Sequence, residues 1–223
     1  MPEFTEAECA TIAIAFGCGE ALLRVIATAA RPVGHARGRS IQTSEDDADR
    51  TVLLLAGRAH ELAYGLDGGA VVLQELGPGD LFGSLLAASG SEDQMEVVPL
   101  TDLRGAGFSQ VTLLHLMESY SCIALAIARQ LSARLRTMRQ RMAETVLLSA
   151  TGRICAELAR RADASGEGVV RPIPVFVEFA LVAQTTRETV SRTVSQLEKR
   201  GIIVREADAL RVVAPHRLAE MIH

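Results

Sequence analysis

The chain lacks the long hydrophobic run that a membrane span requires. No apolar stretch among its 223 residues reaches the roughly 18 residues of a membrane-spanning helix. Residues 1–6 include two glutamates and lack the basic residues that begin a signal peptide. We therefore expect a soluble, cytoplasmic protein with no membrane partner. Because 48% of the chain is hydrophobic, there is ample material for the cores of one large or two ordinary domains.

Cysteine is scarce as well. The four cysteines are Cys9, Cys18, Cys122 and Cys155. They form no C-x-x-C pair, and no nearby histidine completes a zinc-binding spacing, so we expect no metal cofactor. Cys9 and Cys18 leave open a redox pair or a share in a metal site, but small buried residues on helices are the simpler interpretation.

Enzyme signatures are also missing. The sequence has no Gly-x-Ser-x-Gly, no His-Glu-x-x-His and no Walker loop. Gly77-Pro78-Gly79 lacks the following helix that a dinucleotide site requires. Glycine turns in a β structure explain it more simply, so we do not expect an enzyme.

The net charge of −4 argues by itself against a nucleic-acid binder, but the charge is uneven along the chain. From Leu148 onward there are 11 basic and 9 acidic residues, against 12 basic and 18 acidic before it. An acidic regulatory part joined to a mildly basic DNA-binding part has this asymmetry. The basic excess is small, so specific contacts must supplement the general attraction to phosphate.

The most informative segment starts at Thr185 and predicts a helix suited to DNA. Thr186 is a candidate N-cap, whose hydroxyl can accept a bond from a free backbone amide one turn on. One apolar face is formed by Val190, Val194 and Leu197. The side chains that fall largely off that face are Arg187, Glu188, Ser191 and Arg192. Arginine can form two hydrogen bonds with guanine, and glutamate can accept one from cytosine.

The flanks of this helix predict a winged helix. Glu178 to Ala183 forms a short helical segment, followed by a tight turn at Gln184 and Thr185. Two short helices joined in this way form a helix-turn-helix, whose second helix enters the major groove. Basic residues and Gly201 end the second helix, and residues 202–213 predict a β-hairpin that would be the wing.

The first half of the chain predicts short helices followed by β structure. Residues 6–30 are expected to form the helices. Apolar runs at 51–55, 59–64 and 70–76 are separated by glycine-rich turns. Short strands at regular spacing suggest an antiparallel barrel or roll over about 32–108.

Between these parts the pattern becomes helical. Residues from about 110 to 144 predict one long helix, and 145–162 predict another. Residues 169–177 are expected to be strand-like, interrupted by Pro172 and Pro174.

The long helix has an apolar seam and an arginine-rich opposite side. The seam residues are Ala124, Ile127, Leu131, Leu135, Met138, Met142 and Val146. The arginines are Arg129, Arg134, Arg136, Arg139 and Arg141. No other helix of similar length is present, so the seam predicts pairing with a second copy of the chain. The alternative is packing on its own domain, but a helix-turn-helix protein commonly needs two half-site readers.

In this order, the elements resemble the Crp/Fnr family of bacterial transcription regulators. The resemblance is carried by residues 186–192, by Thr151-Gly152-Arg153-Ile154 and by Leu76 to Gly83. It implies an α+β fold with an N-terminal, jelly-roll-like antiparallel β-roll, a long dimerisation helix and a C-terminal winged helix. The implied boundaries are 1–110, 111–147 and 148–223.

The resemblance also implies which residues touch DNA. Arg187, Glu188 and Arg192 match the base-contacting positions, and Thr186 and Thr189 match positions that hold the phosphate backbone. The expected DNA-binding residues are Thr186, Arg187, Glu188, Thr189, Ser191 and Arg192. Gln184 departs from the family, which often has glycine there, and requires a left-handed backbone or a different turn.

The implied effector pocket departs further from the family. Its candidate residues are Gly79, Asp80, Leu81, Phe82, Gly83, Ser84, Asp93, Gln94 and Met138. Ser84 stands where cyclic-nucleotide-binding members have a glutamate for the ribose, and Met138 where cyclic-AMP members have a threonine. Asp93 and Gln94 replace an Arg-Ser or Arg-Thr pair, and a carboxylate repels a phosphate. We expect the roll to bind a different small molecule, or none.

Other family triggers are not matched either. Iron–sulfur members have several closely spaced N-terminal cysteines, whereas Cys9, Cys18 and Cys122 are too few and too far apart. Haem-sensing relatives place Cys and His where this chain has Gly83 and Leu85.

The sequence thus predicts a homodimeric, sequence-specific regulator of palindromic double-stranded DNA. An unidentified effector and RNA polymerase are further candidate partners. One alternative is a small-molecule or redox sensor whose winged helix mediates protein contacts. A partner-regulated or constitutively active repressor also stays open.

Overall fold

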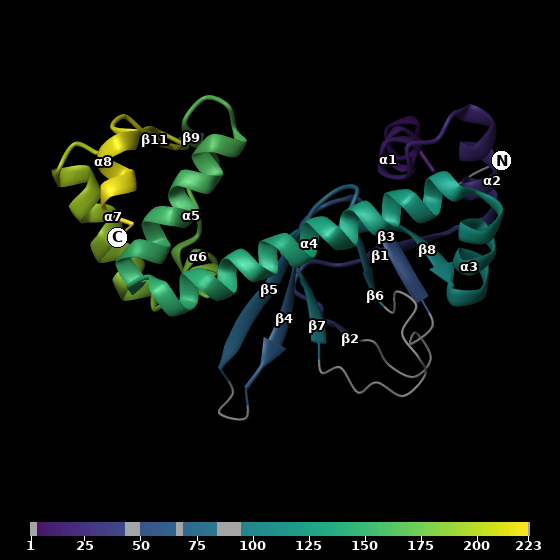
Figure 1. The fold of residues 1–223 in the computed structure, drawn as a ribbon, viewed down its shortest axis with the longest axis horizontal. Coiled ribbons are helices and arrows are strands. Elements are labelled where there is room, and N and C mark those ends of the chain that lie inside the picture. Colours follow the sequence, from purple (N-terminus) through teal and green to yellow (C-terminus); the bar gives the residue numbers. More distant parts are fainter. Residues whose placement is uncertain (1–3, 43–49, 66–68, 84–94, 223) are drawn as a thin grey trace. The chain divides into compact units, whose positions relative to one another are not determined.

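A computed structural model describes residues 4–42, 50–65, 69–83 and 95–222 (Figure 1). The chain divides into two compact units, Met1–Arg136 and Thr137–His223. Helix α4, Ser121–Leu147, contributes to both.

The first unit begins with helices and continues as β structure. Its earlier elements are α1 (Glu6–Phe16), α2 (Glu20–Ala29), β1 (Arg31–His35), β2 (Ile41–Gln42), β3 (Arg50–Ala56) and β4 (Ala59–Tyr64). Its later elements are β5 (Ala70–Leu76), β6 (Leu81–Gly83), β7 (Met95–Pro99), β8 (Leu103–Ser109), α3 (Gln110–Ser119) and the start of α4. In the described ranges the strands form two antiparallel sheets, ordered β1-β8-β3-β6 and β2-β7-β4-β5.

Strand β3 has apolar residues on both faces, because both faces are buried. Val52 and Leu54 belong to a cluster inside the roll, together with Leu76 of β5. Leu53 and Leu55 point the other way, into a second cluster. A strand covered on both faces is a continuous apolar run rather than an alternating one, which explains the run at 51–55.

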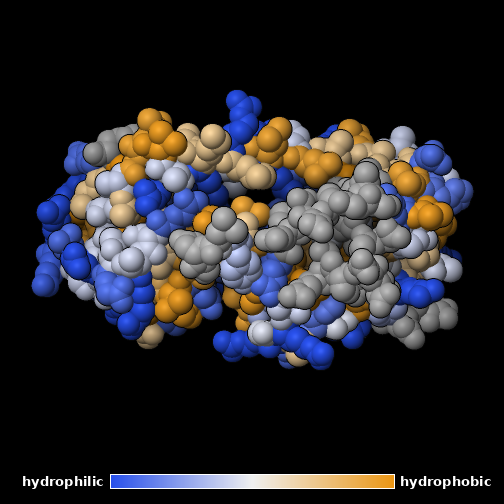
Figure 2. All heavy atoms as spheres, turned by 90° about the horizontal axis from the view of Figure 1, so that it is seen from below, coloured by the Kyte–Doolittle hydropathy of each residue, from blue (hydrophilic) through white to orange (hydrophobic). Residues whose placement is uncertain are grey.

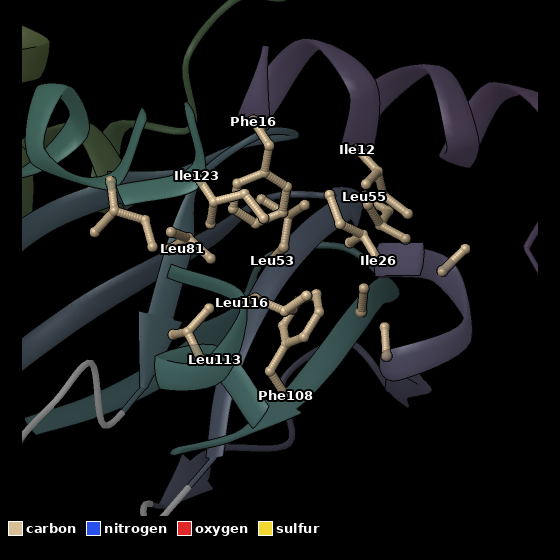
Figure 3. Packing of buried hydrophobic residues seen from close by; sticks show 14 of the residues in the cluster. Ile12, Phe16, Ile26, Leu53, Leu55, Leu81, Phe108, Leu113, Leu116 and Ile123 are labelled. Atoms are coloured by element: carbon tan, nitrogen blue, oxygen red, sulfur yellow. The ribbon is translucent and has the colours of Figure 1, made fainter. Parts of the chain in front are cut away.

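The second cluster lies between the first sheet and the helices, and Figure 3 shows its side chains converging. Its largest fully buried members are Ile12, Phe16, Ile26, Leu53, Leu81, Phe108, Leu113, Ile123 and Ile127. The rings of Phe16 and Phe108 meet edge to face, with centroids 6.2 Å apart. This core holds α1, α2, α3 and the first turns of α4 on the roll.

The second unit is a winged helix. After the last turns of α4 come α5 (Ala150–Ala164), β9 (Val169–Val170), α6 (Phe176–Val182), α7 (Arg187–Lys199), β10 (Ile203–Arg205), β11 (Leu210–Val212) and α8 (Pro215–Glu220). The strands form an antiparallel sheet ordered β10-β11-β9. The predicted α+β fold, with its roll, long helix and winged helix, is confirmed.

Three element boundaries differ from the sequence prediction. The expected single helix from residue 110 is two helices, α3 and α4, bent by 114°. Helix α4 then continues to Leu147, and α5 begins at Ala150, where Ser149 is the N-cap and accepts a bond from the Gly152 amide at 3.0 Å. Residues 169–177 contain only a two-residue strand, and Phe176 already starts α6.

Among the described residues, no single helix is long and apolar enough to cross a membrane, although α1 with α2 and α3 with α4 meet that length and composition test as bent pairs.

The cysteines are all free thiols. Cys9, Cys18 and Cys122 are partly buried against the first unit's core, whereas Cys155 is buried in the second unit. Burial raises the pKa of the Cys155 thiol to about 11. Burial, together with nearby Cys122, raises the pKa of the Cys18 thiol.

We expect Cys155 to be alkylated the slowest of the four cysteines at pH 8. The thiolate is the reactive form, and a pKa near 11 leaves almost none of it at that pH. Timed iodoacetamide labelling followed by peptide mass spectrometry measures the rates. In urea, where burial is lost, the four rates should converge. A native Cys155 that labels as fast as Cys9 would contradict the prediction.

Candidate nucleic-acid interface

The helix-turn-helix consists of α6, a sharp turn and α7. Helix α6 ends at Val182 with Ala183 as its C-cap, and Gln184 has a left-handed backbone with φ of 49°. The Thr185 amide donates a hydrogen bond to the carbonyl of Ala180 at 2.9 Å. A non-glycine residue is strained in this region by about 1 kcal/mol, so the turn must be held by its surroundings.

Thr186 caps the start of α7, as the sequence predicts. Its backbone is extended, and its hydroxyl accepts a bond from the Thr189 amide at 3.2 Å. The two threonine hydroxyls also lie 3.0 Å apart. Glu188 lies in the first turn, where its negative charge suits the positive end of the helix dipole.

The two faces of α7 are sharply different. Its buried side consists of Val190, Thr193, Val194 and Leu197. The other side is exposed and forms one shallow open surface, lined by Arg187, Glu188, Ser191, Arg192, Ser195, Gln196 and Lys199. The apolar face predicted from sequence is therefore confirmed. The polar face is one turn longer than predicted, because Ser195, Gln196 and Lys199 continue it at the same helical spacing.

Arg153 on α5 holds the turn that sets the position of α7. Its guanidinium donates from Nε to the carbonyl of Ala183 at 2.9 Å and from Nη2 to that of Gln184 at 2.8 Å. Nη1 donates to the carbonyl of Leu148 at 2.9 Å. The planar guanidinium thus donates to carbonyls at the C-terminal ends of both α4 and α6. The single ammonium group of a lysine could not do this. Thr145 adds a bond to the Gln184 side chain at 2.9 Å.

Gly152 permits a close approach beside this brace. A Cβ atom at this buried position would lie 2.4 Å from the carbonyl oxygen of Ile222. Glycine is therefore required for the C-terminal residues to pack on α5.

A buried ionic network joins the last turns of α4 to α5. Arg160 bridges Glu144, at 2.7 Å, and the buried Glu157. Arg161 bonds Glu157 at 2.7 Å and lies over the ring of Phe179, 5.0 Å from its centroid. The network therefore connects α4, α5 and α6 within the second unit.

The wing carries basic side chains that are paired. Arg211 contacts Glu206 at 2.5 Å, and Arg205 contacts Glu198 of α7 at 2.7 Å. Each arginine is more than 40% exposed, so these pairs contribute little to stability. In both pairs a carboxylate offsets the charge of the arginine.

The residues expected in the effector pocket are placed in several ways. Gly79 and Asp80 form the turn before β6, while the side chains of Leu81 and Phe82 are buried in two different core clusters. Gly83 ends β6 with φ of 91°. Ser84, Asp93 and Gln94 lie outside the described residues. Met138 is 53% exposed and belongs to the second unit.

The α4 seam is exposed over most of its length. Its exposed large side chains are Leu131, Leu135, Met138, Met142 and Val146, between 44% and 76% exposed. Ile127, expected to share the seam, is only 2% exposed and packs into the first unit's core. Arg134, expected on the side opposite the seam, is half-buried against the roll. Figure 2 shows exposed hydrophobic side chains (orange) among hydrophilic ones.

Comparison with known proteins finds similar sequences for the second unit alone and for most of the chain. Residues 152–221 match the family model of the Crp-like helix-turn-helix domain. The chain is 24% identical over 194 residues to a CRP-like cAMP-activated global transcriptional regulator of Mycobacterium tuberculosis, covering 85% of this chain and 87% of that protein.

Solved structures have the same fold. FixK2 from Bradyrhizobium japonicum has a TM-score of 0.73 at 19% identity, covering 87% of this chain and 98% of its own. A CooA mutant from Carboxydothermus hydrogenoformans has a TM-score of 0.78 at 18% identity, covering 90% of each chain. The c-di-GMP responsive regulator CLP from Xanthomonas campestris has a TM-score of 0.70 at 20% identity, covering 86% and 97%.

Proposed function

Because the chain belongs to the Crp/Fnr family of transcription regulators and carries a Crp-like helix-turn-helix domain, we propose that it binds palindromic operator DNA as a homodimer. The exposed face of α7 is the observation that carries this proposal. Its basic, acidic and hydroxyl groups project from a helix whose opposite face is buried.

In the proposed complex, α7 lies in the major groove with its N-terminal residues at the base edges. Arg187 and Arg192 contact bases as donors, and Glu188 accepts from a cytosine amino group. Thr186 and Thr189 hold the phosphate backbone near the helix N-terminus, where free amides favour an anion. Arg153 supports this geometry by fixing the turn, without itself touching DNA.

The second subunit is proposed to pair along the α4 seam. Exposed apolar side chains at positions 131, 135, 138, 142 and 146 repeat at spacings of three and four. This is the spacing of a two-stranded coiled coil. A two-fold axis along α4 would present two copies of α7 to two half-sites.

Selection of bound sequences from a random double-stranded library tests the proposal. A palindromic consensus is expected, with an affinity that falls steeply as salt rises, because phosphate contacts release counterions. Recovery of no enriched sequence, with binding to proteins instead, would favour a winged helix used for protein contacts.

Removing the Arg187 side chain is expected to weaken binding to the selected operator by roughly 10- to 100-fold, from the loss of about 1–3 kcal/mol. The loss should be concentrated at one guanine, so that other bases are tolerated there. Titrations of Arg187→Ala against operators mutated at single positions measure this. Lys199→Ala is the matched control, since it should weaken all sequences alike and reduce the salt slope by about one.

We further propose that the roll does not use cyclic AMP in the usual way. The sequence has Ser84, Asp93 and Gln94 in place of the ribose and phosphate ligands of cyclic-nucleotide-binding members. Titration calorimetry of the purified protein with cyclic AMP and cyclic GMP is expected to show no binding at micromolar concentrations. Micromolar affinity for either nucleotide would refute this part of the proposal.

A further inference from the structure

Helix α4 directs two long polar side chains onto the glycine turn that precedes β6. Gln130 donates from Nε2 to the carbonyl of Gly79 at 3.0 Å. Arg134 donates from Nη2 to the carbonyl of Leu81. The two side chains are four residues apart and so share one face of the helix. Arg134 also follows Ile127 by one heptad, which places it on the side that packs on the roll.

The turn itself is held by several hydrogen bonds. The Asp80 carboxylate accepts from the Gly77 amide at 2.8 Å, and the Asp80 carbonyl accepts from the Leu54 amide at 2.8 Å. The Gly79 amide also donates to the carbonyl of Leu54 at 2.8 Å. Gly79 has φ of 96°, which favours glycine. Helix α4 thus takes the Gly79 carbonyl of the turn and the Leu81 carbonyl of β6, while β3 pairs with the Gly79 amide and the Asp80 carbonyl.

Two carboxylates face the Arg134 guanidinium. Asp80 and Glu61 both interact with it electrostatically. Burial lowers the pKa of Arg134, and the two carboxylates oppose that shift. Burial raises the pKa of Glu61, and Arg134 opposes that shift. Two of the chain's own carboxylates therefore offset part of this positive charge.

We propose that Gln130 and Arg134 act as a built-in ligand, fastening α4 to the glycine turn of the roll in place of an effector. The first part of α4 is then held on the roll when no small molecule is present. The consequence for DNA binding rests on the proposed function. With α4 fastened in this way, operator binding needs no effector. An anionic effector would have to compete with Asp80 and Glu61 for the same guanidinium, which disfavours it.

A small neutral molecule is the competing occupant. Gln130 Oε1 and Arg134 Nε are buried and have no partner within the described ranges. A molecule that donates to the first and accepts from the second would satisfy both. The experiment therefore uses protein freed of bound small molecules by unfolding in guanidinium, dialysis and refolding.

We call the bonds of Gln130 and Arg134 to Gly79 and Leu81 the clamp. Hydrogen exchange followed by mass spectrometry tests the clamp on the full-length, ligand-stripped chain. In Arg134→Met, amides of β6 and of residues 121–136 are expected to exchange at least tenfold faster than in the wild type. Arg136→Met is the matched control, because Arg136 is exposed, and it should leave exchange unchanged. Gln130→Leu should give a smaller acceleration at the same amides, and it serves as the test should Arg134→Met fail to refold.

The outcomes separate the clamp from the proposed function. Unchanged exchange in Arg134→Met and Gln130→Leu would overturn the clamp. Stripped wild-type protein that binds the operator only after the released small-molecule fraction is returned would overturn effector independence. Faster exchange in a protein that binds no DNA under any condition would support the clamp and overturn the proposed function.

Discussion

The Leu135→Asp variant is expected to sediment as a monomer and to lose at least about 100-fold in operator affinity. Leu135 is 58% exposed in the single chain, so the charge is solvated in the monomer and leaves its fold intact. In the proposed dimer the same carboxylate would be buried against its symmetry mate without a partner, which is strongly unfavourable. Two linked half-site readers gain about 10²- to 10⁴-fold over one, and this gain disappears with the dimer.

Arg136→Asp is the control for charge alone. It changes the net charge by twice as much as Leu135→Asp, but at an exposed position off the seam. It should remain dimeric by analytical ultracentrifugation. Circular dichroism should show both variants folded. A dimeric Leu135→Asp protein, or a monomeric Arg136→Asp protein, would contradict pairing along this seam.

The sequence predicted the parts whose pattern is local. The α7 start combines a capping hydroxyl with apolar residues at helical spacing, and both features were found. The hairpin of β10 and β11 follows a glycine and a short apolar run. Gln184 was expected to have either a left-handed backbone or a different turn, and its φ is positive. For the α7 start and the hairpin, a few adjacent residues determine the conformation.

The bend between α3 and α4 could not be predicted in this way. The apolar spacing of Leu113 and Leu116 continues into Ile123 and Ile127, with no proline or glycine between them. All four side chains enter the same core, from two helices bent by 114°. The break at Tyr120 is therefore imposed by tertiary packing, which overrides local propensity.

The two internal arginines differ in what the sequence reveals. Arg134 lies one heptad after Ile127, so its inward position was open to inference, although it was only assigned, with four other arginines, to the side opposite the seam. Arg153 gave no such signal beyond its place in a family-like segment. Two of its partners are main-chain carbonyls about 30 residues away. Every residue has such a carbonyl, so the sequence does not indicate which ones Arg153 contacts.

Replacing Arg153 by alanine is expected to lower the free energy of unfolding of the second unit by about 3 kcal/mol. Hydrogen bonds from a charged donor are worth about 1.5–3 kcal/mol each, and the three bonds of Arg153 share one side chain that is partly exposed, so they do not add fully. For a unit of this size the melting temperature should fall by roughly 10–20 °C. Scanning calorimetry should show this loss in the second unit's transition only.

The chemistry of the brace predicts how its variants rank. Arg153→Lys keeps the charge but replaces a planar fork with a single ammonium, which cannot reach carbonyls at both helix ends, so it should recover only a small part of the stability. Arg200→Ala removes an exposed arginine from the same unit and should change the melting temperature by little. Because the strained Gln184 turn loses its support, Arg153→Ala should also weaken operator binding at temperatures where the unit is folded. Stability equal to the wild type in Arg153→Ala would show that the turn is held by other contacts, with the Thr145 bond to Gln184 as the first to examine.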